Sequence, residues 1–242
     1  MKNKLKKQIG PMILQSIIML WLQIFSSGCG DNAAAQHKTG SKSETLVALG
    51  FDQSLSVADF RKLDTSFVAA VCDTVAANGG GLVVVYGIGN VTDKSGLRCS
   101  LRPVPKMDEG LVISKQAELQ QKIKSARVDN EKLIREFLRK VQAEIFTVNS
   151  DTVKYSDIIG FFKKVDILLS EPNNQRMIRY VFAYTDGIQS LPGKKDFSAC
   201  YNFKTPGKFS LCLAGWKAMP SCNFPNAENF EDPQGFLEYL NQ

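Results

Sequence analysis

The sequence predicts an α/β fold: a doubly wound, mostly parallel sheet with helices on both faces and one antiparallel edge strand. Three observations indicate it. Nearly continuous apolar runs, such as residues 44–51, are typical of strands buried on both faces. These runs alternate with segments in which apolar residues recur at helical spacing. A shorter run, 96–101, alternates apolar and polar residues before Pro103 and Pro105, which suits an edge strand.

The predicted elements follow one another in a regular order. The first strand, 44–51, leads to a helical pattern that starts at Val57 and stops at Asn78-Gly79-Gly80-Gly81. The further strands are predicted at 82–86, 96–101, 177–184 and 209–215, and the further helices at about 113–146, 156–169 and 233–240. Strands that alternate with helices imply parallel pairing, so we expect the two kinds of element to form separate layers.

The longest helical pattern covers residues at about 113–146. One of its faces is rich in Lys, Glu, Gln and Arg, and the other is apolar. The apolar positions are Leu119, Ile123, Ala126, Leu133, Phe137, Val141 and Ile145. This pattern predicts an amphipathic helix that packs on the domain, while a stalk or a partner surface is the alternative.

The amino terminus predicts an export signal over residues 1–28. Four lysines among the first seven residues precede an apolar run, 9–25, and then Ser26-Ser27-Gly28. A retained transmembrane helix is the alternative, because the run has about the minimum length for spanning. Residues 29–43 are small and polar and read as a flexible tether. One domain, 44–242, follows.

Cys29 stands directly after Ser-Ser-Gly, which resembles the lipobox of bacterial lipoproteins, with Ser26 where leucine is usual. The resemblance implies that Cys29 is acylated and becomes the first residue of the mature protein. Several acyl chains on one cysteine hold a protein on a membrane firmly. We therefore expect a membrane-anchored lipoprotein of the bacterial cell envelope, at the outer membrane and on its periplasmic or surface face.

Net charge and histidine content exclude several functions. Removing the signal lowers the formal net charge from +6 to about +2, which is too little to indicate nucleic-acid binding. The only histidine, His37, lies in the predicted tether. A zinc site of the usual Cys/His kind and Ser-His-Asp or Cys-His catalysis are therefore improbable. Gly87-Ile88-Gly89 lacks the third glycine of a dinucleotide-binding loop.

The domain contains an odd number of cysteines, so at least one of them is free in the monomer. They are Cys72, Cys99, Cys200, Cys212 and Cys222. Cys200 and Cys222 flank the strand that carries Cys212, in segments read as loops, and we predict a disulfide between them. Cys72 and Cys212 have apolar neighbours and are expected to stay reduced in the core.

Three polar clusters stand where ligands of an α/β sheet bind, outside the carboxyl ends of its strands. Asp52, Ser54 and Ser56 follow the first strand, Ser156-Asp157 opens a helix, and Thr185-Asp186-Gly187 ends the third buried strand. Taken singly, Ser56 and Ser156 are plausible helix N-caps and Asp-Gly is a common turn pair. Taken together, the clusters indicate a site for a hard cation, because hydroxyls and carboxylates are the ligands of Mg²⁺.

With these clusters the chain resembles the von Willebrand factor A domain family, whose metal-ion-dependent adhesion site uses Asp-x-Ser-x-Ser, a threonine from a middle loop and a later aspartate. The resemblance covers essentially the whole domain from Thr45. It implies metal ligands at Asp52, Ser54, Ser56, Ser156 and Asp186. It also implies Mg²⁺ (or Mn²⁺ or Ca²⁺) as the ion and a partner protein that offers an acidic side chain to it.

The sequence departs from the family pattern in two ways. Ser156 replaces the threonine, and the stretch from Asp52 to Ser156 is longer than usual, which the resemblance implies is due to a long helical insertion at about 113–146. Asp157 is an alternative ligand, although a first helical residue more often serves the helix dipole. The function implied is a membrane-anchored binding module and not an enzyme. The alternatives are a structural component of an envelope complex with a vestigial metal site and a metal-dependent hydrolase, against which the lack of histidine and lysine near the motif argues.

Overall fold

The computed structural model of the chain describes segments 43–54, 63–90, 95–107, 112–147, 152–217 and 226–242, together with residues 57, 110 and 224. These segments belong to one compact unit, Lys42–Gln242. The predicted export signal and Cys29 lie outside the described residues, as does nearly all of the predicted tether.

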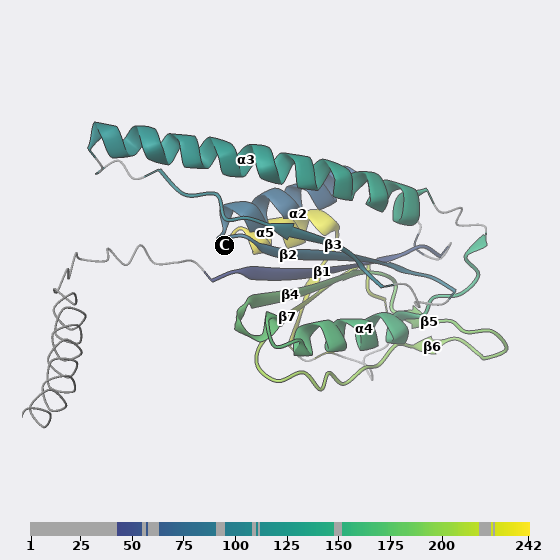
Figure 1. Cartoon of the computed structure of the whole chain (residues 1–242). Helices are drawn as coiled ribbons and strands as arrows, with labels where there is room; N and C mark the ends of the chain where they lie inside the picture. Colours follow the sequence, from purple (N-terminus) through teal and green to yellow (C-terminus); the bar gives the residue numbers. More distant parts are fainter. Residues whose placement is uncertain are drawn as a thin grey trace, which may run out of the picture. The chain divides into compact units, whose positions relative to one another are not determined.

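A six-stranded sheet with the order β3-β2-β1-β4-β7-β8 forms the centre of this unit (Figure 1). Its strands are β1 (Thr45–Asp52), β2 (Gly81–Ile88), β3 (Leu97–Leu101), β4 (Ile178–Tyr184), β7 (Ser210–Ala214) and β8 (Ala227–Phe230). Neighbouring strands are parallel, except that β3 pairs antiparallel with β2 at one edge. The predicted doubly wound α/β fold and its antiparallel edge strand are therefore confirmed.

Three short strands lie outside the strands that the sequence predicts. β8 forms the second edge of the sheet, and β5 (Ile188–Gln189) pairs with β6 (Phe197–Ser198) in a separate hairpin. None of the three has an apolar run, because each is short and partly exposed. Their pairing partners, rather than their own composition, make them strands.

Helices cover both faces of the sheet. They are α2 (Thr65–Ala77), α3 (Ile113–Val141), α4 (Ile158–Ser170) and α5 (Pro233–Leu240), and α3 continues as the π-helix η2 (Gln142–Phe146). Figure 1 shows α2, α3 and α5 on one side of the sheet and α4 on the other.

Two helices begin later than the sequence suggests, and aspartate caps account for both starts. α2 starts at Thr65 instead of near Val57, because Asp64 is its N-cap and accepts a hydrogen bond from the Ser66 amide. α4 starts at Ile158, and Asp157, not Ser156, caps it by accepting from the Gly160 amide. Ser156 is therefore free of the capping role that its sequence context suggested.

The central strand β1 is buried on both faces because alternate side chains enter different cores. Val47, Leu49 and Phe51 pack in the core that contains α2, α3 and α5. Leu46 and Ala48 pack in the core that contains α4. Gly50 also faces α4, and a Cβ atom there would lie 2.5 Å from Cζ of Phe161. Close approach of α4 thus brings the loop before this helix to the carboxyl end of β1.

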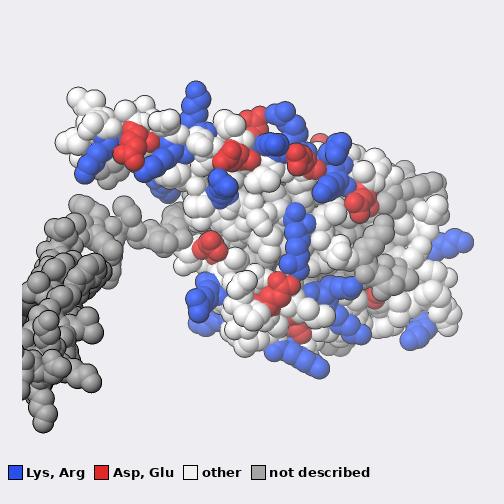
Figure 2. Space-filling model, in the orientation of Figure 1, with Lys and Arg blue, Asp and Glu red and all other residues white. Residues whose placement is uncertain are grey.

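Helix α3 is anchored mainly through its carboxyl-terminal half. Phe137 and Val141 are buried there, whereas Leu119 and Ile123 in the first half are only half-buried and Ile113 is 85% exposed. Figure 2 shows Lys and Arg interspersed with Asp and Glu along α3. Among the described residues, no helix combines the length and apolar character needed to cross a membrane.

Candidate functional site

The candidate site lies at the carboxyl ends of β1 and β4. From β1 the chain passes through α2 to β2 on one side, whereas β4 pairs with β1 on the other side. The strand order therefore reverses between β1 and β4, and this is where doubly wound sheets bind their ligands. Asp52 ends β1, Thr185 and Asp186 follow β4, and Ser156 lies in the loop before α4.

A single carboxylate forms the centre of the site. Asp52 is fully buried, and its Oδ1 accepts hydrogen bonds from the Ser54 amide at 3.0 Å and from the Ser156 hydroxyl at 3.0 Å. Its Oδ2 accepts from the Thr185 hydroxyl at 2.7 Å. The Ser54 hydroxyl also bonds to this carboxyl group. Three segments that are far apart in the sequence thus meet at one pair of carboxylate oxygens.

Burial dominates the electrostatics of this carboxyl group. Loss of solvent raises the pKa of Asp52 above its usual value of 3.8, and the hydrogen bonds from Thr185, Ser54 and Ser156 oppose that rise. Within the described part of the chain, no Lys or Arg contributes to this shift. Among those residues the ionised carboxylate therefore has no positive partner, and a cation bound here would favour its charged form.

Thr185 is the residue that sequence reasoning missed as a possible ligand. Its hydroxyl donates to Asp52, and its Oγ1 accepts from the Gly187 amide at 3.2 Å. Strand alternation could have identified it. Asp52 continues the face of β1 that packs toward α4, and Thr185 continues the corresponding face of β4, which carries Val181 and Ala183.

Asp186 lies at the same rim but uses its carboxylate locally. Its Oδ1 accepts from the Ile188 amide at 2.9 Å, which closes the turn that carries Gly187 at φ 79°. Among the described residues, the hydrogen bonds to Asp52 come from Ser54, Ser156 and Thr185 rather than from Asp186. Ser56, the remaining predicted ligand, lies outside the described residues.

Asp157, the alternative ligand, performs a structural task. Its Oδ1 accepts from the Gly160 amide at 3.0 Å and from Nε2 of Gln189 at 3.1 Å. Its amide donates to the carbonyl oxygen of Gly89 at 3.0 Å. These contacts fix the start of α4 against the end of β2 and the hairpin strand β5, and so they hold the neighbouring Ser156 in position.

The side chain of Asn90, just after β2, also holds the loop that leads to Ser156. Its Oδ1 accepts from the amides of Lys154 and Tyr155 at 2.8 and 3.0 Å, and its Nδ2 donates to the carbonyl oxygen of Thr152 at 3.0 Å. One side chain thus satisfies three backbone groups of the loop that leads to Ser156. The position of the Ser156 hydroxyl is therefore set by the end of β2 as well as by α4.

The two glycines near the end of β2, Gly87 and Gly89, leave room for the side chain of Gln53. A Cβ at Gly87 would lie 2.7 Å from Oε1 of Gln53, and one at Gly89 would lie 3.3 Å from the same atom. The Gln53 side chain fills this space and donates to the carbonyl oxygen of Ile145 in η2 at 2.9 Å. Gln53 therefore ties the residue after Asp52 to the end of the long helical segment.

Four cysteines of the domain belong to the described residues. Cys200 is disulfide-bonded, whereas Cys72, Cys99 and Cys212 are free and buried. The predicted partner of Cys200, Cys222, lies outside the described residues, so their pairing stays a prediction. In the described segments, no three His, Cys, Asp or Glu side chains gather as a metal-binding group. A cation at Asp52 would therefore depend largely on hydroxyl oxygens.

Comparisons with known proteins give no family for the chain. No protein-family model and no curated protein sequence matches it. Among solved structures, it is similar to the pilus adhesin SpaC from Lactobacillus rhamnosus GG in an open conformation, with a TM-score of 0.39 and 8% sequence identity. The match covers 82% of this chain and 29% of the adhesin, so the chain spans under a third of that protein's length. A likeness of this degree carries no argument.

Proposed function

We propose that the protein is a membrane-anchored binding module of the von Willebrand factor A type, in which the Asp52 cluster holds Mg²⁺ for a partner protein. The observation that supports this most is the buried Asp52 carboxylate, which hydroxyl groups from three separate segments surround at the point where the strand order reverses. The anchor in this proposal is an acylated Cys29, and the location is the bacterial cell envelope.

The residues present fit a small, hard cation. Asp52 supplies a carboxylate, and Ser54, Ser156 and Thr185 supply hydroxyl oxygens, which are the kinds of ligand that Mg²⁺ prefers. Ser56 and Asp186 are the further ligands in this proposal. When bound, the ion would supply positive charge beside the buried Asp52 carboxylate. Because few carboxylates of the protein would neutralise the ion, it could attract a carboxylate from a partner.

The hairpin beside the site favours an acidic partner. It leaves the rim directly after Asp186-Gly187, and its turn carries two exposed lysines, Lys194 and Lys195, beside one exposed carboxylate, Asp196. Ile188 and Phe197 on its strands are 39% and 43% exposed. A partner segment with a carboxylate at the ion would meet both positive charge and apolar surface on this hairpin.

A second candidate, a structural protein with a vestigial site, is favoured by the same hydrogen bonds. Both Asp52 oxygens already accept from hydroxyl groups, so the network is satisfied within the chain itself. Such a network would stabilise the junction of β1, β4 and the loop before α4 without an ion. Binding of a divalent ion distinguishes the two candidates.

The test is calorimetric titration of the purified chain with Mg²⁺ and Mn²⁺, compared with Asp52→Asn. We expect one ion to bind the wild type and none to bind the variant, which keeps the size of the side chain but removes its charge. Partner capture from a cell-envelope extract should then need Mg²⁺ and fail in a chelator. If the folded wild type binds neither ion at millimolar concentration, the site is vestigial.

A further inference from the structure

A pocket lies at the rim of the sheet opposite Asp52. The first residues of β4, β7 and β8 line it, and these parallel strands begin at the rim opposite the one where Asp52 ends β1. Its volume is about 810 Å³, within the range of about 300–1,000 Å³ that is usual for small-molecule sites. The pocket is therefore large enough for a ligand and separate from the candidate metal site.

Three phenylalanines line this pocket and contact one another. Phe203 lies against Phe209, with ring centroids 4.8 Å apart, and against Phe224, with ring centroids 6.5 Å apart. All three pack on the core that contains α4, as do Met177 and Leu211, which also line the pocket. An apolar part of a ligand placed among these side chains would be removed from water, which is favourable.

The pocket also contains a buried positive charge. Arg179, the second residue of β4, lines the pocket and is only 4% exposed. Its guanidinium donates to the carbonyl oxygens of Leu169, Pro206 and Lys208, at distances of 2.8 to 3.2 Å. In the described part of the chain, no carboxylate pairs with Arg179, and the lining includes no Asp or Glu. A buried cation is stabilised most by an anion, and this pocket offers none of its own.

Gly207 leaves the guanidinium open toward the pocket. A Cβ atom at this position would lie 2.7 Å from Nη2 of Arg179, and the φ of 83° is one that favours glycine. Because Gly207 lines the pocket and has no side chain, space remains beside Nη2. The next residue, Lys208, lines the same pocket and is exposed. Two positive side chains therefore border an apolar space.

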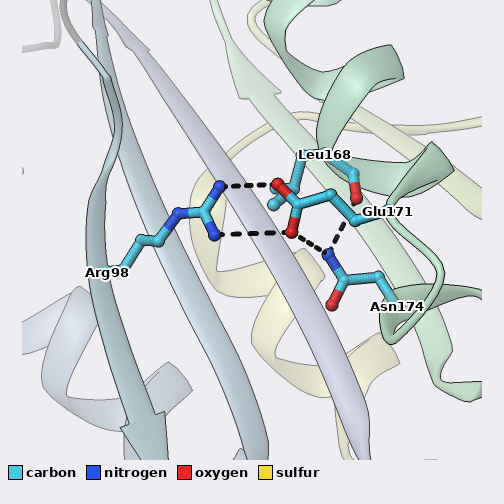
Figure 3. A network of polar contacts seen from close by, with 4 residues as sticks. All are labelled: Arg98, Leu168, Glu171 and Asn174. Carbon is cyan, nitrogen blue, oxygen red and sulfur yellow. Dashed lines mark hydrogen bonds and ion pairs between the residues drawn. The ribbon is translucent and has the colours of Figure 1, made fainter.

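Hydrogen bonds hold the segment between α4 and β4 that leads into the pocket. Asn174 donates to the carbonyl oxygen of Leu168 at 2.8 Å and to Glu171 at 3.1 Å (Figure 3). Glu171 also forms a two-armed ion pair with Arg98 of β3, with N–O distances of 3.4 and 2.9 Å. The next carbonyl oxygen of α4, that of Leu169, accepts from the buried guanidinium. The start of β4 is thus already in place, as is usual for ligand pockets.

We propose that this pocket binds a carboxylate with an apolar tail, such as a fatty acid. The carboxylate lies beside the guanidinium of Arg179 and the ammonium group of Lys208, and the tail lies among the three phenylalanines. Charge selects this class of ligand, because a neutral or cationic apolar molecule would leave both positive groups without an anion. The site does not depend on a metal at Asp52.

The experiment is calorimetric titration of the folded full chain with decanoate, below the concentration at which decanoate forms micelles. Decanol, which has the same tail without the charge, is the matched ligand. We expect one decanoate to bind per chain and Tm to rise with its concentration. Decanol should bind at least about tenfold more weakly, because it lacks the charged hydrogen bonds. If decanoate does not bind, or if decanol binds equally well, the proposal is wrong.

Substitutions in the lining locate the bound carboxylate. Lys208→Gln should weaken decanoate binding by about two- to fivefold, since an exposed charge is partly screened. Ala227→Leu, at the start of β8, should weaken it by a larger factor, because the longer side chain takes up space in the pocket. Lys195→Gln is the matched control, because it removes the same charge from an exposed position outside the lining. Arg179 is left in place, since three carbonyl oxygens need it as their donor. Wild-type affinity in the folded Lys208→Gln and Ala227→Leu variants would overturn the proposal.

Discussion

At the scale of single residues, the least expected participant is Thr185. Its hydroxyl donates to Oδ2 of Asp52, whereas Oδ1 of Asp52 accepts from the Ser54 amide and the Ser156 hydroxyl. Replacing it with valine keeps the shape and leaves a buried carboxylate oxygen without that donor. We expect Thr185→Val to lower the free energy of unfolding by about 1–3 kcal/mol in urea denaturation. Ser100→Ala, at an exposed position on β3, is the control and should change little.

The same cluster makes stability depend on pH in a definite direction. Because the pKa of Asp52 is raised in the folded protein, protonated Asp52 favours folding. That contribution is complete below the ordinary value of 3.8 and is lost as the pH rises through the raised pKa. In a chelator, the free energy of unfolding of the wild type should therefore fall relative to Asp52→Asn as the pH rises from about 4 toward neutral. A difference that is constant with pH would show that Asp52 ionises as freely in the folded chain as in the unfolded one.

At the scale of elements, the long helix α3 divides into two parts with different energetic roles. Phe137 is 4% exposed in the shared core, whereas Ile123 in the first half is only half-buried. We expect Phe137→Ala to lower the free energy of unfolding by about 3–5 kcal/mol through the cavity it leaves. Ile123→Ala should cost less than about 1 kcal/mol. Equal effects in chemical denaturation would mean that the whole helix is packed against the unit.

The polar side of the same helix should contribute little to stability. Glu118–Lys122 and Glu131–Arg135 are spaced i, i+4, and all four side chains are more than half exposed. Pairs of this kind contribute a few tenths of a kcal/mol and weaken with salt. The charges along α3 in Figure 2 therefore contribute little to the stability of the fold, and their main effect is to make the exposed surface of the helix favourable in water.

At the scale of the whole molecule, the remaining prediction concerns attachment to a membrane. If Cys29 is acylated, Cys29→Ala should move the protein from the membrane fraction to the soluble fraction, or leave it uncleaved with its signal attached. Fractionation and intact mass spectrometry measure both outcomes. Cys212→Ser is the control, because its thiol is buried in the described unit. Unchanged mass and unchanged partition in Cys29→Ala would exclude the lipoprotein assignment.

Much of the architecture follows from the pattern of apolar and polar residues within each segment of the chain. Apolar runs identified β1, β2, β4 and β7, because a strand buried on both faces must be apolar at nearly every position. Alternation identified β3 as an edge. Short β8 and the hairpin strands had no such signal, since they depend on their neighbours for pairing. The caps at Asp64 and Asp157 also had to be seen in place, because several residues near each helix start are able to cap it.

For the candidate site too, the sequence predicts some features and the tertiary structure decides others. The sequence by itself determined that polar clusters follow β1 and β4 and precede α4, because parallel strands bring their carboxyl ends to one edge. Only the tertiary structure decided that the Thr185 hydroxyl donates to Asp52, whereas the Asp186 carboxylate accepts from the Ile188 amide. The physical reason is that periodicity along the chain reports which face a residue occupies. Contact between distant segments depends instead on the register and packing of elements, to which the whole chain contributes.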